Sequence, residues 1–201
     1  MKKINQLIII LLAVMTMTGC AMNGAMEEGN SISVAKNGTI IGTLMNVLDQ
    51  SYYDPEELKS MIISEIADVN QEYGESAVEL NDFKCDDSGN VKVKIKYANS
   101  EAYEAFNGCT FFSGASVVAH QVYGLEGNFL SVNEGKLTTE EAVVADDSKI
   151  VVLTENLNVV VPGKIVAITD NVEITGKKTA TVKIPTEENE SEEELAYIVY
   201  K

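Results

Sequence analysis

Residues 54–74 read DPEELKSMIISEIADVNQEYG, and this stretch predicts one amphipathic helix. Asp54 is suited to the N-cap, and Pro55 fits the first turn, where its missing amide hydrogen is not needed. Apolar side chains then recur at helical spacing and form one stripe. Its members are Leu58, Ile62, Ile66, Val69 and Tyr73. Gly74 ends the pattern, as is common just after a helix. We therefore expect a helix over residues 55–73 that buries one face.

Strands are predicted on both sides of this helix. Residues 91–97, VKVKIKY, alternate between apolar residues and lysines, which is the pattern of a strand with one face in the core. Residues 86–90, DDSGN, have turn composition, so residues 77–85 are expected to be the antiparallel partner. Residues 39–49 are apolar and partly β-branched, and they predict a strand before the helix.

A second helix and strand complete this part of the chain. Residues 101–106, with Ser100 as the cap, predict a short helix, and residues 109–112 predict a strand. The resulting order is β-α-β-β-α-β, which is the order of a ferredoxin-like sandwich. We therefore expect an α+β fold in which residues 38–113 form a four-stranded antiparallel sheet. Its last strand should lie beside its first, and both helices should cover one face.

Residues 114–201 predict a mostly antiparallel β region that packs on the first domain or follows it, with a helix at 115–123. Strands are expected from the β-branched runs at 150–153, 158–161, 164–168, 172–174, 179–184 and 195–200. Residues 151–164 are faintly echoed by residues 166–177, which we interpret as similar turns in a meander. Thr186–Glu194, here called the acidic segment, has six glutamates in nine positions. It is expected to be a solvated hairpin loop.

The N-terminus has the features of an export signal. Two lysines precede a short apolar run, residues 8–14, that is too short to span a bilayer. Residues 17–20, MTGC, follow and resemble the lipobox of bacterial lipoproteins. The resemblance implies a signal peptide over residues 1–19, cleavage before Cys20, and a diacylglyceryl group on the Cys20 thiol. The alternative is an ordinary secretory signal.

A chain anchored in this way would lie on the membrane without crossing it. Residues 20–37 have linker composition and are expected to form a lipidated, flexible tether. The resemblance thus implies a location on the extracytoplasmic face of the cell membrane, with membrane contact through the lipid at Cys20.

Composition limits the partners of the chain. Of its 201 residues, 45% are hydrophobic and 23% are charged, which is typical of globular proteins. Its 15 basic residues are all lysines and stand against 31 acidic residues, so the formal net charge is −16. This balance argues against nucleic-acid binding, which needs a basic face. It also predicts repulsion from anionic lipid headgroups.

Two cysteines remain for the folded part of an exported chain. Cys85 and Cys109 are consistent with either a disulfide or two free thiols. In the predicted sheet they lie near opposite edges, and bridged α-carbons must approach within about 7 Å. The topology therefore favours free thiols. Neither cysteine has another at metal-ligand spacing, and His120 is the only histidine, which argues against structural zinc.

No catalytic signature emerges from the sequence. Any Ser-His or Cys-His catalyst must use His120, with a nucleophile chosen from Ser113, Ser116, Cys109 and Cys85. His120 lies in an apolar run without the glycine pattern of a nucleophile elbow, so a packing or surface role is favoured.

Oxygen-rich segments give no metal or acid-base site either. Asp86, Ser88 and Asn90 place oxygens at alternate positions, but the spacing of the following residues favours a turn over a calcium loop. Adjacent acids such as Asp146 and Asp147 are expected by chance at this composition. No catalytic, cofactor-binding or metal-binding residue is assigned.

These observations lead to one main functional hypothesis and one alternative. The main hypothesis is a lipid-anchored, extracytoplasmic and non-enzymatic module that binds a ligand or a protein partner in the cell envelope. The alternative is a hydrolase that acts on envelope or polymeric substrates with carboxylates. A filled sandwich without a cleft would favour binding.

Overall fold

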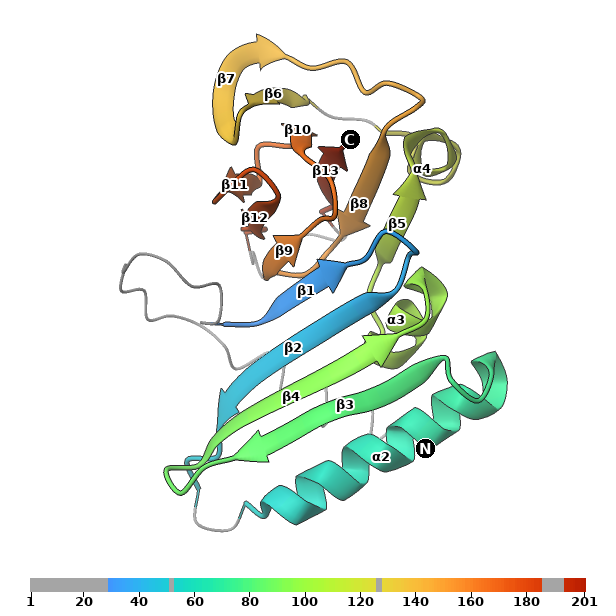
Figure 1. Cartoon of the computed structure of the whole chain (residues 1–201), viewed down its shortest axis with the longest axis vertical. Helices are drawn as coiled ribbons and strands as arrows, with labels where there is room; N and C mark the ends of the chain where they lie inside the picture. The colour runs from blue at the N-terminus through green and yellow to red at the C-terminus, as the bar shows by residue number, and fades with distance from the viewer. Residues whose placement is uncertain (1–28, 51–52, 126–127, 186–193) are drawn as a thin grey trace.

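Two β-sheets and three helices form the part of the chain that this computed structural model describes, residues 29–50, 53–125, 128–185 and 194–201 (Figure 1). The helices are α2 (Pro55–Tyr73), α3 (Ser100–Asn107) and α4 (Ser116–Tyr123). In spatial order, sheet A contains β11 (Val172–Ile174), β12 (Thr179–Val182), β9 (Asn158–Val160), β1 (Ser31–Val34), β2 (Ile40–Val47), β4 (Asn90–Tyr97) and β3 (Val78–Cys85). Sheet B contains β5 (Phe111–Ala115), β8 (Lys149–Leu153), β13 (Ala196–Tyr200), β10 (Ile165–Ile168), β6 (Leu130–Asn133) and β7 (Lys136–Glu141). The protein is therefore a mixed α and β structure dominated by a two-sheet sandwich.

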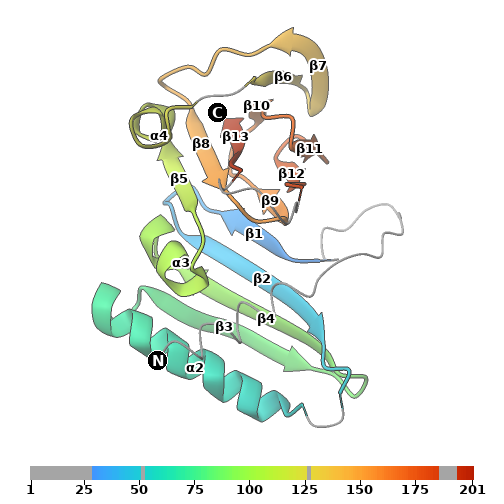
Figure 2. The ribbon, with the colours of Figure 1, turned by 180° about the vertical axis from the view of Figure 1, so that it is seen from behind.

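Helix α2 forms where the sequence predicts it. The Asp54 carboxylate accepts a hydrogen bond from the Glu56 backbone N–H at 2.9 Å, which caps the first turn. At the other end, the Gly74 N–H donates to the carbonyl of Asn70. The apolar stripe is buried at Ile62, Ile66 and Val69. Helix α2 runs alongside β3 in both views of the ribbon (Figure 1 and Figure 2).

The predicted hairpin between β3 and β4 is confirmed. The two strands pair antiparallel, and the apolar side chains of the alternating stretch are buried in β4. The turn is closed by Asp86, whose carboxylate accepts hydrogen bonds from the backbone N–H groups of Ser88 and Asn90, both at 2.9 Å. The Asp86 carboxylate, one of the groups that suggested a calcium loop, therefore serves the turn.

The cap of α3 differs from the prediction. Asn99, rather than Ser100, caps the helix, and its side chain accepts from the Ala102 N–H at 2.9 Å. Ser100 is the first helical residue, and its hydroxyl oxygen accepts from the Ser113 backbone N–H at 2.9 Å. The residue that was expected to cap the start of the helix thus connects the helix to a strand.

The structure does not confirm a ferredoxin-like sandwich. The chain order β2-α2-β3-β4-α3-β5 is the predicted one, and β2, β4 and β3 are neighbours in the expected order. The last strand, β5, does not join them, because it pairs in sheet B with β8, of which all residues but Lys149 are buried. The position beside β2 is taken by β1 instead. The prediction failed because residues 31–34 were assigned to the tether, which left only the last strand to pair with the open side of β2.

The predicted tether over residues 20–37 is too long. Residues Ser31–Val34 form β1, in which Ile32 and Val34 are buried. Strand β1 pairs antiparallel with β2 and parallel with β9, so it joins the two halves of the chain into one sheet. Residues 20–28 of the predicted tether lie outside the described residues.

The C-terminal region is rich in β-structure, but its strands alternate between the two sheets. Strands β8 and β10 belong to sheet B, whereas β9 and β11, which follow them, belong to sheet A. Each crossing uses a Thr-acid-Asn segment, residues 154–156 and residues 169–171, so the faint repeat marks two equivalent connections. Strands β12 and β13 also lie in different sheets, so the hairpin predicted across the acidic segment is wrong. Residues 186–193 themselves lie outside the described residues.

Sheet B is buried on both faces around β8 and β13. Its inner side packs on sheet A through residues such as Val151, Leu153 and Ile198. Its outer side, with Ile150 and Val152, packs against Ala119 of α4. Sheet B therefore has buried side chains on both of its faces, whereas sheet A has one face that is directed away from the core.

Candidate functional site

The predicted anchor residue, Cys20, lies outside the described residues. The first described residue is Gly29, two positions before β1. Among the helices that the structure describes, none is long and apolar enough to cross a membrane.

The structure does not join His120 to a nucleophile. His120 lies exposed on α4, and within the described ranges it forms no hydrogen bond to a serine or cysteine. The Ser116 hydroxyl is buried and donates to the carbonyl of Ala145 at 2.7 Å. These observations fit the surface role that the sequence favoured for His120.

The two cysteines lie in different sheets and are free thiols. Cys85 ends β3 at the edge of sheet A, whereas Cys109 precedes β5 at the edge of sheet B. Both are half-buried. Within the described ranges, no group of cysteine, histidine and acidic side chains is arranged to hold a metal ion.

A polar cluster that the sequence did not predict surrounds Glu155. The Glu155 carboxylate accepts hydrogen bonds from the Tyr103 hydroxyl at 2.8 Å and from the Cys109 thiol at 3.1 Å. Burial, followed by the nearby Glu155 carboxylate, raises the pKa of both Tyr103 and Cys109. Both donors therefore hold their protons, so the Cys109 thiol is a poor nucleophile. The cluster ties α3 to the β8–β9 connection.

A shallow depression lies between the ends of α2 and α3. It has a volume of about 280 Å³ and is lined by Tyr73, Glu75, Asn99 and Glu101, together with small residues. Both glutamates are exposed. The depression brings together none of the residues that the sequence singled out as nucleophile, base or metal ligand.

The most distinctive surface is the outer side of sheet A, which we call the open face. The inner side packs against α2, α3 and sheet B, whereas the outer side chains of β9, β1, β2 and β4 are half-buried or exposed. Strand register assigns its central, uncharged positions to Ser31, Ser33, Ile41, Thr43, Met45, Asn158 and Val160. The open face is broad and is formed by regular strands, so its side chains have fixed spacing.

Charge on the open face is the reverse of that in the whole chain. The strands of this face carry four lysines and three acidic residues, and Lys183, which follows β12 and pairs with Glu173, adds a fifth lysine; the chain has 15 and 31. The four strand lysines are Lys84, Lys92, Lys94 and Lys96, and the acids are Glu79, Asp82 and Glu173. Each of these acids has an ion pair with a lysine. The alternating pattern of β4 predicted that three of these lysines lie on the side of the strand away from the core, but the sequence could not show which residues lie beside them.

Two of the ion pairs of the open face lie along β3. Lys96 pairs with Glu79 at 2.8 Å, and its hydrogen bond lowers the pKa of that carboxyl. Lys84 pairs with Asp82 at 2.8 Å and lowers its pKa in the same way. Lys94 adds a further, weaker attraction to Asp82. On β3, Lys94 and Lys96 thus lie opposite carboxylates, whereas Lys92 lies opposite Lys84. On β2, all three lie opposite uncharged residues.

Comparison with known proteins gives no further guide. No protein-family model matches the chain, and no curated protein or solved structure matches it. The functional argument therefore depends on the sequence motif at Cys20 and on the surface of the fold.

Proposed function

We propose that the chain is a lipid-anchored, extracytoplasmic module that binds a partner in the cell envelope through the open face of sheet A. The observation that carries the proposal is the charge of this face, on which lysines outnumber acidic residues although the chain is strongly acidic. A second acidic body can approach this face with less repulsion than it meets elsewhere. Its hydroxyl and amide side chains can add hydrogen bonds.

The lipid anchor would keep the module close to the membrane. The described fold begins at Gly29, with β1 at Ser31. The ten residue-to-residue steps from Cys20 to Asn30 span at most about 35 Å when fully extended. Two acyl chains on Cys20 would make the attachment stable, because each buried methylene contributes about 0.8 kcal/mol.

Fractionation tests the anchor. Cys20→Ala should leave the full chain unprocessed or release it from the membrane fraction, because no thiol remains to carry the lipid. Cys85→Ala is the matched control and should fractionate like the parent chain. Metabolic labelling with a radioactive fatty acid should mark the parent and the control, but not Cys20→Ala. Membrane retention of Cys20→Ala at the parent's size would show that the lipobox assignment is wrong.

Obstruction of the open face tests the binding proposal. Thr43→Tyr places a ring at the centre of the face, whereas Ser60→Tyr places the same ring on the exposed side of α2. Partners crosslinked to the anchored parent chain in its own membrane should be lost with Thr43→Tyr and kept with Ser60→Tyr. Equal capture by both variants would locate partner binding elsewhere.

A further inference from the structure

We infer that the outer side of α4 rests on the lipid surface to which the chain is anchored. The contact is made by a valine patch, which consists of Val117, Val118 and Val122 of α4 and Val143 of the connection between β7 and β8. The inference deepens the proposed function and rests on its anchor, because it names the side of the folded body that faces the membrane.

Helix α4 is apolar on both of its sides. Ser116 and Ala119 are buried and Tyr123 is half-buried, and this side of the helix packs on sheet B. On the other side, Val118 is 42% exposed and Val122 is 63% exposed. A helix that is apolar all round is normally a buried helix. The outer side of α4 therefore has the composition of a surface that is covered.

Helix propensity does not account for these valines. A β-branched side chain loses rotamer freedom in a helix, so valine is a poorer helix former than alanine, leucine or glutamate. At an exposed position, the side chain gains little burial within the chain to offset this loss. A helix that faced only water would be more stable with straight-chain or polar residues at Val118 and Val122.

The connection between β7 and β8 extends the apolar surface. It runs beside α4 in both views of the ribbon (Figure 1 and Figure 2), and its Ala142 and Val144 pack on the cluster that contains Ala119. Val143, which lies between them in the sequence, is 94% exposed. Four of the nine large apolar side chains that are exposed in the described part of the chain thus belong to the valine patch. Such a concentration marks an interaction surface.

Charge indicates that this surface can approach lipid. The sequence of α4, SVVAHQVY, contains no acidic residue, whereas α2 contains five and α3 contains two. In the neighbouring connection Asp146 and Asp147 are exposed, and Asp147 pairs with Lys201 at 3.0 Å, which offsets its charge. Because the whole chain has a formal net charge of −16, α4 is the described helix that headgroup phosphates repel least.

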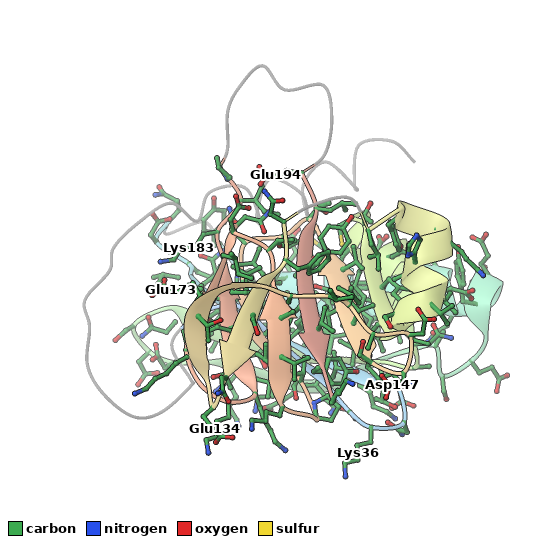
Figure 3. All side chains as sticks on the ribbon, turned by 90° about the horizontal axis from the view of Figure 1, so that it is seen from above. Lys36, Glu134, Asp147, Glu173, Lys183 and Glu194 are labelled. Atoms are coloured by element: carbon green, nitrogen blue, oxygen red, sulfur yellow. The ribbon has the colours of Figure 1, made fainter. Side chains whose placement is uncertain are left out.

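The place of α4 in the layers leaves the open face free. Helix α4 packs on the outer side of sheet B, whereas the open face is the outer side of sheet A. In the view from above, α4 lies on the opposite side of the molecule from Glu173 and Lys183 of the open face (Figure 3). A body that rests on α4 therefore turns the open face away from the bilayer, where a partner can reach it.

The predicted tether is long enough for this orientation. Packed sheets lie about 10 Å apart, and a helix with its side chains is about 10 Å across. About 20 Å therefore separate sheet A, in which the described fold begins, from the outer side of α4. The steps from Cys20 to Asn30 span at most about 35 Å. The lipid at Cys20 and the valine patch can thus meet the same bilayer.

A photoreactive lipid tests the contact. The lipidated full chain, purified from its own membrane, is reconstituted into phosphatidylcholine vesicles in which part of the lipid has a diazirine near the carboxyl end of one acyl chain. This group lies at the boundary between headgroups and acyl chains, where the apolar side of an interfacial helix is buried. Illumination is followed by cleavage after glutamates and mass spectrometry.

Two peptides give the comparison. Residues 105–126 contain α4, and residues 58–65 contain Ile63 of α2, which is 49% exposed and serves as the matched control. We expect at least tenfold more labelling of residues 105–126, concentrated at the valines. Equal labelling of the two peptides, or labelling of neither, would overturn the inference, whether the valines then face water, a second copy or another protein.

Matched variants test the role of the valines, with labelling at Val143 in residues 142–155 as the readout. Val118→Asp/Val122→Asp should lower this labelling at least tenfold, because carboxylates would have to enter the headgroup region. Ile63→Asp places a carboxylate at a similarly exposed apolar position and should leave it within twofold of the parent. Val118→Leu/Val122→Leu keeps the patch apolar and should label at least as strongly as the parent. Retention of labelling in the double aspartate variant, or its loss in the double leucine variant, would overturn the inference.

Fractionation separates this inference from the anchor. If Cys20→Ala leaves the membrane fraction but residues 105–126 of the parent stay unlabelled, the inference is wrong and the anchor stands. If Cys20→Ala stays in the membrane fraction at the parent's size while the valines of the parent are labelled, the lipobox assignment is wrong and the contact of α4 with lipid stands.

Discussion

The Glu104 carboxylate accepts a hydrogen bond from the Phe111 backbone N–H at 2.9 Å. One turn earlier on α3, the Ser100 hydroxyl accepts from the Ser113 N–H at the same distance. Phe111 and Ser113 are alternate residues of β5, the edge strand of sheet B. Side chains of a helix thus take the hydrogen bonds that a neighbouring strand would take, which protects this edge from pairing with another chain.

Glu104→Ala should destabilise the fold by about 1–3 kcal/mol, because the N–H of a fully buried residue loses its acceptor. Glu101→Ala removes an exposed carboxylate from the same helix and should change the free energy of unfolding by less than about 0.5 kcal/mol. Denaturant unfolding of the two variants measures the difference. Equal losses would show that Glu104 contributes no more than any exposed residue of α3.

Cys109 should be alkylated slowly in the native protein at pH 8, at least tenfold more slowly than in denaturant. Burial raises the pKa of its thiol, and the thiolate is the reacting form. Mass spectrometry of the Cys109 peptide over time measures the rate. Both Cys85 and Cys109 should be labelled in denaturant without a reductant. Protection of the two until a reductant is added would instead reveal a disulfide.

Glu155→Leu should cost about 1–3 kcal/mol, because the buried Tyr103 hydroxyl would lose its acceptor. Asp170→Leu is the matched control, since Asp170 occupies the equivalent position of the second Thr-acid-Asn connection and is exposed. A double-mutant cycle of Glu155→Leu with Tyr103→Phe should give a coupling of about 0.5–3 kcal/mol. Additive effects would mean that the two residues do not stabilise each other.

Glu134 should make stability depend on pH in the acid range. Hydrogen bonds from Lys164 and Lys177, aided by their charges, lower the pKa of Glu134 to about 2. Because the folded pKa is below the ordinary value of 4.5, the stabilisation is present above pH 4.5 and is lost as the pH falls toward 2. Glu134→Gln should therefore unfold more easily than the parent at pH 6, and the two curves should converge near pH 2. Glu75→Gln should show no such convergence. A Glu134→Gln deficit that is unchanged at pH 2 would contradict the assignment.

Local features were predictable from the sequence because they depend on neighbouring residues. The α2 helix follows from the Asp54 cap and the apolar stripe, and the β3–β4 hairpin follows from the alternation of β4 and the turn at Asp86. The outward position of Lys92, Lys94 and Lys96 follows from the same alternation. In each case the repeating side-chain pattern and the residue that caps or closes the element lie within about 20 residues of each other.

Long-range features were not predictable from the sequence. The partner of β5 is β8, about forty residues away, and a short strand carries no signal for which sheet it joins. Strand β1 has only four residues among linker-like neighbours, so its burial depends on β2 and β9. In the sequence, Glu155 cannot be distinguished from the other 30 acidic residues, because its partners Tyr103 and Cys109 come near it only in the folded chain. The only sequence feature that sets Glu155 apart is its position in the Thr-acid-Asn repeat.

The interior position of β1 bears on how the folded body withstands mechanical force. A pull on the chain before Ser31 acts along a strand that is hydrogen-bonded on both sides, antiparallel to β2 and parallel to β9. Such a pull loads the two ladders in shear, so many hydrogen bonds must break together, whereas an edge strand can peel away one bond at a time. A force applied on the N-terminal side of this protein would therefore act first on a strand that is held on both sides.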